Sequence, residues 1–117
     1  MSNQHKPQNL TKDNFRENVL EASRPALVDF WADWCAPCHR VAPSVERLAE
    51  TFEGQLTVGK VNVDEEPELA QSYGIRSIPA LLVFRDGKVV DQIAGAVAFA
   101  QLSESVERVL DANRTFS

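Results

Sequence analysis

The sequence predicts an α/β fold with a central mixed β-sheet flanked by helices on both faces. Two observations predict it: apolar stretches of strand length alternate with segments of helical periodicity, and a strong hairpin signal precedes a closing amphipathic segment. Helices between strands are typical of parallel pairing, whereas a hairpin adds an antiparallel pair. The chain has 117 residues and is 44% hydrophobic, which suits one core of ordinary size. We place a polar N-terminal segment at 1–9 and a single domain at 10–117.

The first predicted elements are a helix and a buried strand. Apolar residues fall on one face of a helix over 11–20, for which Thr11 is a suitable N-cap, and the segment before it has room only for a short strand. Residues 25–31 form an almost continuous apolar run, which is typical of a strand buried on both faces. Only Asp29 interrupts this run. Because a buried carboxylate is costly unless it is paired or protonated, we expect the pKa of Asp29 to be raised.

A longer amphipathic helix is predicted after the cysteines. Its buried face carries Val41, Val45, Leu48, Ala49 and Phe52. Gly54 should end this helix, and Pro43 should kink it. The alternation over 56–63 predicts a strand, and residues 68–73, between a proline and a glycine, form a predicted short helix.

The C-terminal third contains a hairpin and a last helix. Two strand-like runs, 80–84 and 89–93, flank Asp86 and Gly87, and this dipeptide is a strong signal for a two-residue turn. The last helix is predicted from the apolar face formed by Phe99, Leu102, Val106, Val109 and Leu110.

Composition and charge exclude several classes of function. Twelve Lys and Arg residues stand against 17 Asp and Glu, the net charge is −5, and the basic residues form no run that could neutralise several phosphates, so we expect no nucleic-acid partner. Residues 1–9 are polar where a secretory signal would be apolar, and no stretch is apolar enough to span a membrane. We therefore expect a cytoplasmic protein without a membrane partner. Thiols in that compartment are kept reduced, so Cys35 and Cys38 are more often catalytic, redox-sensing or metal-binding than structural.

The two cysteines lie between the predicted buried strand and the amphipathic helix. Cys35 should therefore stand at a helix N-terminus, where free backbone N–H groups and the helix dipole favour a thiolate and lower the pKa of the thiol. Cys38, one turn further into the helix, should be more buried and less acidic. This asymmetry predicts that Cys35 attacks a substrate disulfide and that Cys38 then displaces the reduced product.

Two other uses of the cysteines are less well supported. A structural disulfide would close so short a loop that it stabilises the fold by only about 2 kcal/mol. A zinc site needs two further ligands, but the sequence has only two histidines, His5 and His39, and no second cysteine pair. We therefore expect no metal.

The chain resembles the thioredoxin family. The matching motifs are FWADWCAPC at 30–38, VNVD at 61–64, YGIRSIP at 73–79, FRDG at 84–87 and Gly95, in the family's order and spacing over about residues 10–113. The resemblance is to the bacterial type, with WCAPC as a variant of the active-site sequence WCGPC. It implies the thioredoxin fold and a monomeric protein-disulfide reductase. It also implies recycling by thioredoxin reductase, which uses NADPH and FAD, while this chain binds no cofactor beyond its own redox-active disulfide.

The resemblance also assigns roles to residues. Asp29 is expected to take the proton of Cys38, directly or through water, with Lys60 as its electrostatic partner. Pro79 matches the family's cis-proline, and the backbone of Ile78 is expected to hydrogen-bond an extended substrate segment. The residues expected to surround Cys35 as a flat apolar substrate-binding rim are Trp34, Ala36, Pro37, Ile78, Gly95 and Ala96.

The chain departs from the family pattern close to the cysteines. Ala36 stands where Gly is usual, and because Ala favours helix over Gly by up to about 1 kcal/mol it should alter the redox potential, in a direction the sequence does not fix. His39 stands where Lys or Arg is common, so the charge beside the site should change near neutral pH, and a His39→Lys variant should show a flatter pH dependence of reduction.

Alternative functions stay open at this point. The chain could act as an oxidant or isomerase, which its reduction potential against glutathione would decide. It could also be a non-catalytic binding module, which a Cys35→Ser, Cys38→Ser double variant with full biological activity would favour. A glutathione-fed enzyme is a further alternative, separable by the reductase that recycles it.

Overall fold

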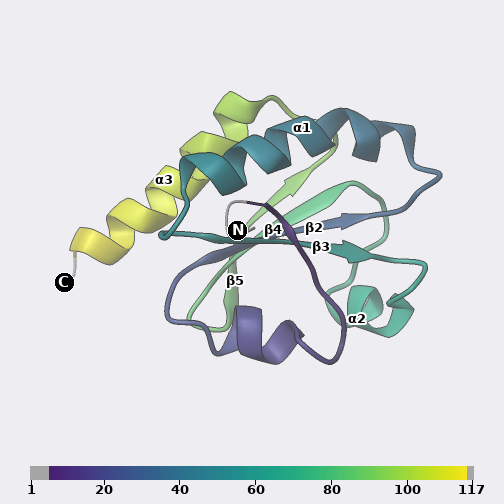
Figure 1. The fold of residues 1–117 in the computed structure, drawn as a ribbon, viewed down its shortest axis with the longest axis horizontal. Coiled ribbons are helices and arrows are strands. Elements are labelled where there is room, and N and C mark those ends of the chain that lie inside the picture. The colour runs from purple at the N-terminus through teal and green to yellow at the C-terminus, as the bar shows by residue number, and fades with distance from the viewer. Residues whose placement is uncertain (1–5, 116–117) are drawn as a thin grey trace.

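A five-stranded mixed sheet forms the centre of the molecule, which confirms the predicted fold class (Figure 1). The computed structural model describes residues 6–115, so residues 1–5 of the polar N-terminal segment, His5 among them, and residues 116–117 lie outside the described part. The strands are β1 (Gln8–Asn9), β2 (Ala26–Trp31), β3 (Thr57–Asn62), β4 (Ala80–Arg85) and β5 (Lys88–Ala94). Their order in the sheet is β1-β3-β2-β4-β5. The β3 strand pairs in parallel with β1 and β2, and β4 pairs antiparallel with β2 and β5.

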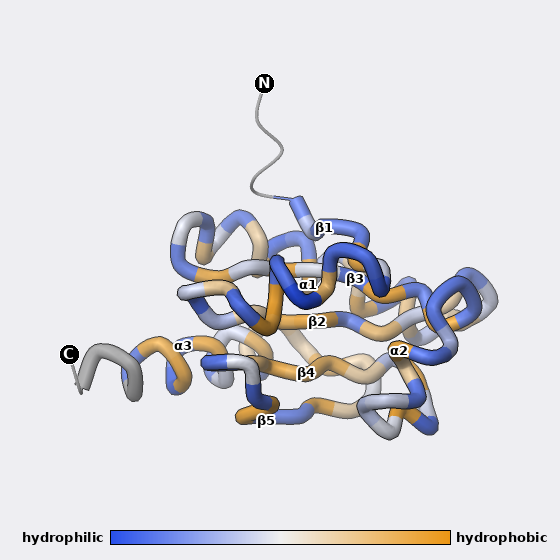
Figure 2. Tube along the Cα trace, turned by 90° about the horizontal axis from the view of Figure 1, so that it is seen from below, coloured by the Kyte–Doolittle hydropathy of each residue, from blue (hydrophilic) through white to orange (hydrophobic). Residues whose placement is uncertain are grey.

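Helices cover both faces of this sheet. They are η1 (Arg16–Leu20), α1 (Ala36–Thr51), α2 (Pro67–Ser72) and α3 (Phe99–Thr115). Helices α1 and α3 lie on one face, and η1 and α2 lie on the other (Figure 1). Along β4, Leu81 and Val83 pack in the cluster beneath α1 and α3, whereas Leu82 and Phe84 pack in the cluster beneath η1 and α2. This two-sided burial is why the central strands β2 and β4 are almost wholly apolar (Figure 2).

The predicted helix over 11–20 is shorter than expected. The regular part is η1, a single π-helical turn in which the Glu21 N–H donates to the Arg16 carbonyl at 2.8 Å. Ahead of it, the Phe15 N–H donates to the Thr11 carbonyl at 2.9 Å, which is a helical bond. Before it, the Thr11 N–H donates to Asn14 Oδ1 at 2.8 Å, and the Asp13 N–H donates to Thr11 Oγ1 at 3.2 Å. These reciprocal side-chain bonds form a capping box, in agreement with Thr11 as the predicted N-cap, although only Arg16–Leu20 is regular helix.

The turns and strands elsewhere follow the prediction closely. Asp86 and Gly87 both have positive φ, 53° and 78°, as the tight hairpin turn requires. Helix α1 contains Pro43 and is followed by Gly54, whose φ of 84° suits the chain reversal after the helix. The short strand expected near the N-terminus is β1, which lies within the segment 1–9.

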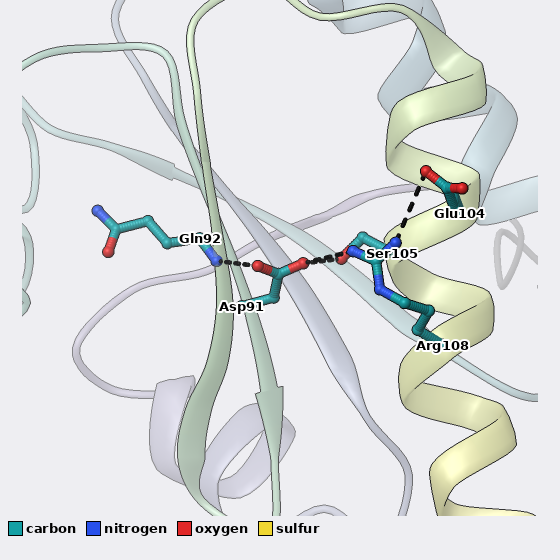
Figure 3. Close-up of polar contacts among 5 residues, drawn as sticks. All are labelled: Asp91, Gln92, Glu104, Ser105 and Arg108. Atoms are coloured by element: carbon teal, nitrogen blue, oxygen red, sulfur yellow. Dashed lines mark hydrogen bonds and ion pairs between the residues drawn. The ribbon is translucent and has the colours of Figure 1, made fainter.

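A polar cluster fastens the edge strand β5 to helix α3 (Figure 3). Asp91 accepts hydrogen bonds from the Ser105 hydroxyl and from Arg108, the latter at 3.4 Å. Arg108 also lies 3.6 Å from a carboxylate oxygen of Glu104. Because Ser105 is buried, its hydroxyl needs such a partner. The cluster thereby holds the strand that leads directly to Gly95, one of the expected site residues.

The close approach of β1 to β3 gives a test of this packing. A side chain at Gly59 would overlap the buried side chain of Leu10. We expect Gly59→Ala to lower the free energy of unfolding by about 1–3 kcal/mol, the usual cost of overpacking a core, as measured by urea denaturation.

A double variant provides the control. Leu10→Ala alone should cost about 2–5 kcal/mol, but adding Gly59→Ala to it should cost clearly less than in the wild type, because the new methyl group then has room. Strictly additive losses would contradict the overlap.

Candidate active site

The site is built around a disulfide at the N-terminus of α1. Cys35 and Cys38 are bonded to each other, with their Cα atoms 5.2 Å apart. Cys35 is the N-cap of the helix, and its Sγ accepts the Cys38 N–H at 3.2 Å. Pro37 falls within the first turn, where its missing N–H costs nothing. The predicted position of Cys35 is therefore confirmed. The expected difference in burial is small in this disulfide form, since Cys35 is 4% exposed and Cys38 is 2% exposed.

This geometry favours negative charge on one sulfur. If the disulfide opens, an anionic Cys35 keeps the Cys38 N–H as a donor and lies at the positive end of the helix dipole. Cys38 lies inside the helix, and within residues 6–115 its sulfur accepts no hydrogen bond that would stabilise a thiolate in the same way. The arrangement can therefore support attack by one cysteine and resolution by the other.

A loop before β4 lies against the disulfide. The Ile78–Pro79 peptide bond is cis, as the resemblance implies, and the Ile78 carbonyl oxygen lies 3.8 Å from Cys35 Sγ. The Pro79 carbonyl accepts the Gly95 N–H at 3.1 Å, which fastens the end of β5 to the same loop. The fold thus brings together three segments that are far apart in the sequence.

The expected rim residues differ in exposure. Trp34 is 70% exposed, the largest exposed hydrophobic side chain among the described residues, and Ala36 and Ala96 are also exposed. Pro37, Ile78 and Gly95 are half-buried, whereas Pro79 is buried beneath them. The rim is therefore apolar, but Pro79 supports it from below.

Sequence analysis gave no role to several residues beside the rim. A cavity of about 170 Å³ lies between Trp34 and Ile78 and is lined by Val63 and Ile75. The Trp34 Nε1–H donates to Asp64 Oδ2 at 2.8 Å, which fixes the indole. The sequence could have predicted this contact, because parallel strands end at the same edge of a sheet. The residues that follow β3 therefore lie near those that follow β2.

Asp29 is fully buried in the middle of the sheet. Neither of its carboxylate oxygens has a hydrogen-bond partner within residues 6–115. Burial raises the pKa of Asp29 to about 6, and the positive charge of Lys60, its register partner on β3, opposes this rise. The expectation of a raised pKa is confirmed.

Trp31 connects Lys60 with the cysteines. Lys60 Nζ lies 4.4 Å from the centroid of the Trp31 ring, a cation–π distance. The half-buried Trp31 packs in turn against the cluster formed by Ala32, Cys35 and Cys38. Lys60 is thus linked to the disulfide through Trp31, which lies between them.

Within 6–115, no three His, Cys, Asp or Glu side chains gather as they would around a metal ion. No helix of that part of the chain is long and apolar enough to cross a bilayer.

Comparison with known proteins gives consistent matches. The family model described as Thioredoxin matches residues 6–108. Thioredoxin 1 of Nostoc sp. is 48% identical over 101 residues, which cover 86% of this chain and 94% of the relative. The chloroplastic M-type thioredoxin of Chlamydomonas reinhardtii is 48% identical over 99 residues, which cover 85% and 71%. A solved structure of a mutant thioredoxin from Halobacterium salinarum superposes with a TM-score of 0.83 at 32% identity, covering 92% of this chain and 94% of that one.

The match extends over nearly all of the described residues and agrees with the cysteine pair at disulfide distance. We conclude that the chain belongs to the thioredoxin family and is a dithiol–disulfide oxidoreductase.

Proposed function

We propose that this oxidoreductase reduces the disulfide bonds of other proteins in the cytoplasm and is returned to its dithiol form by thioredoxin reductase. NADPH and FAD would belong to that partner. The observation that carries the proposal is Cys35 Sγ at the N-terminus of α1, with the Cys38 N–H donating to it. The cytoplasmic location is supported by cysteine usage, since both cysteines of the chain form the redox pair and none is left for a separate structural disulfide.

The reaction proceeds by two exchanges. The Cys35 thiolate attacks a substrate disulfide, so that a Cys35–substrate bond forms and the other substrate sulfur leaves and takes up a proton. The Cys38 sulfur, after losing its proton, attacks Cys35 Sγ, which forms the intramolecular disulfide and releases the second substrate sulfur. Two electrons pass from the dithiol to the substrate, and the product is the disulfide form seen here.

Asp29 is the proposed acceptor of the Cys38 proton. Its raised pKa, about 6, leaves it mostly ionised at neutral pH yet basic enough to accept a proton. The positive charge of Lys60 favours the ionised form of Asp29. The absence of competing hydrogen bonds to Asp29 within residues 6–115 supports this role, because its lone pairs are free.

Substrate binding is assigned to the apolar rim. Trp34, Ala36 and Ala96 are exposed and so accessible to a substrate. The backbone of Ile78, next to the cis-peptide at Pro79, is expected to pair with an extended substrate segment. Gly95 and Pro37 complete this surface. Such a surface contacts backbone and apolar groups, so we expect it to accept many sequences around a disulfide.

The first prediction tests the reductase itself. Wild-type protein should couple insulin disulfide reduction to NADPH consumption in the presence of a thioredoxin reductase. Cys38→Ser should lower turnover at least about a hundredfold, because the nearby resolving thiol is lost, and should accumulate a mixed disulfide on Cys35 that mass spectrometry detects. A Cys35→Ser variant is the control and should trap no substrate. Wild-type protein that exchanges with no oxidised protein would overturn the proposal, and a reduction potential well above that of glutathione would indicate an oxidant instead.

The second prediction concerns the proton acceptor. At pH 7, Asp29→Asn should slow resolution of the mixed disulfide about tenfold or more, the lower end of general-base effects, and should leave its formation within about twofold. Stopped-flow fluorescence separates the two steps. In the wild type the resolution rate should rise with pH as Asp29 ionises near pH 6, and Lys60→Gln should move this rise to higher pH. Equal slowing of both steps by Asp29→Asn would refute the assigned role.

The third prediction concerns stability and follows from the same group. Because the pKa of Asp29 is raised from 3.8 to about 6 on folding, its contribution to stability is present at low pH and is lost as pH rises through about 6. The stability of disulfide-form Asp29→Asn relative to wild type should therefore grow by up to about 3 kcal/mol between about pH 4 and pH 8. Urea denaturation at both pH values measures the difference. A relative stability independent of pH would show that Asp29 titrates normally.

A further inference from the structure

His39 makes a contact that no assigned role explains. It lies in the first turn of α1, directly after Cys38, and its ring Nε2 lies 2.7 Å from the carbonyl oxygen of Asp33. Because a carbonyl oxygen only accepts, Nε2 must carry the hydrogen, which fixes the tautomer of the neutral ring. The hydrogen bond therefore forms whether or not the ring is charged.

The bond ties the helix to the loop that delivers Cys35. Asp33 belongs to the short loop after β2, two residues before Cys35, and the neighbouring Trp34 is fixed on its other side by Asp64. The Cys35 N–H donates to the Ala32 carbonyl at 3.2 Å inside the same loop. A shift of this loop relative to the first helical turn would change the distance between Cys35 Sγ and the Cys38 N–H.

The His39 ring is also held from a second side. Its centroid lies 6.1 Å from that of Trp31, with the two planes at 80°, an edge-to-face contact. Trp31 is the last residue of β2 and Asp33 follows two residues later. His39 thus contacts Trp31 at the end of β2 and Asp33 in the loop that follows. The contact with Trp31 restricts the orientation of the ring and so favours the hydrogen bond to Asp33.

We propose that His39 is a positioning residue for the disulfide exchange, which holds the loop of residues 32–34 against α1 through its bond to Asp33. This rests on the proposed function, since it concerns the same cysteine pair. By keeping Cys35 Sγ within reach of the Cys38 N–H, the bond favours the Cys35 thiolate that attacks the substrate disulfide. A lysine at position 39 would be a poorer tether, because its long flexible stem loses more rotamer freedom on forming one bond.

Two neutral amide variants separate the hydrogen bond from charge and from bulk. In His39→Gln the amide nitrogen reaches about as far as the imidazole Nε2, whereas in His39→Asn it is too short to reach Asp33. Both replacements are uncharged amides, so the two variants carry the same charge as each other and differ only in reach. Arg40→Gln, an exposed change on the same helical turn, is the matched control.

The readouts are the rate of iodoacetamide alkylation of Cys35 in the reduced protein and the kcat and KM for insulin reduction. We expect His39→Asn to lower the alkylation rate and kcat about two- to threefold with little change in KM, the size of effect that part of one hydrogen bond can produce. His39→Gln and Arg40→Gln should stay within about 1.5-fold of the wild type, a difference smaller than one such bond would give.

The outcomes are distinct from those that test the reductase. If His39→Asn matches the wild type, the bond to Asp33 has no effect on the exchange and the inference is overturned, while insulin turnover by the wild type still supports the proposed function. If His39→Gln falls as far as His39→Asn, the ring contact with Trp31 is responsible and the inference is also overturned. Urea denaturation of each variant in the disulfide form shows whether the fold is kept, and an effect that follows only the loss of stability would count against positioning.

Discussion

The hydrogen bond from the Cys38 N–H to Cys35 Sγ is the interaction on which the chemistry depends. This hydrogen bond forms because β2 ends at Trp31 and α1 begins at Ala36, which makes Cys35 the N-cap of the helix. At that position the side-chain oxygen of a serine, threonine or aspartate usually accepts a backbone N–H. A sulfur in that position has its charge stabilised by a group that every helix leaves free. The rest of the fold holds the strand and the helix in this relation.

The central sheet contains a buried carboxylate, Asp29, whose burial is energetically costly. A carboxylate without hydrogen bonds in the interior opposes folding at neutral pH, as the raised pKa of Asp29 records. The apolar clusters on both faces of the sheet offset this cost, and Lys60 reduces it. The proposed role as proton acceptor would give this costly carboxylate a function.

Most of the fold could be predicted from the sequence because its signals are local. Apolar runs and the Asp86–Gly87 turn set the strands, and the cysteines and Asp29 stand out by type and surroundings. The helix expected over 11–20 was too long, since only Arg16–Leu20 is regular, whereas the side-chain bonds of Thr11 and Asn14 agree with the predicted N-cap. The tether from His39 to Asp33 and the support of Trp34 by Asp64 could not be predicted, because each depends on how separate elements meet.

The polar cluster between β5 and α3 also affects the end of β5 that lies beside the candidate site. Asp91 holds β5 to the helix, β5 runs on to Gly95, and Gly95 bonds to the carbonyl of the buried Pro79. The Gly95 end of β5, beside the candidate site, is therefore connected through the strand to a cluster that lies outside that site. Loss of the Ser105 hydroxyl would therefore loosen β5 and, through Gly95, the loop that carries Pro79.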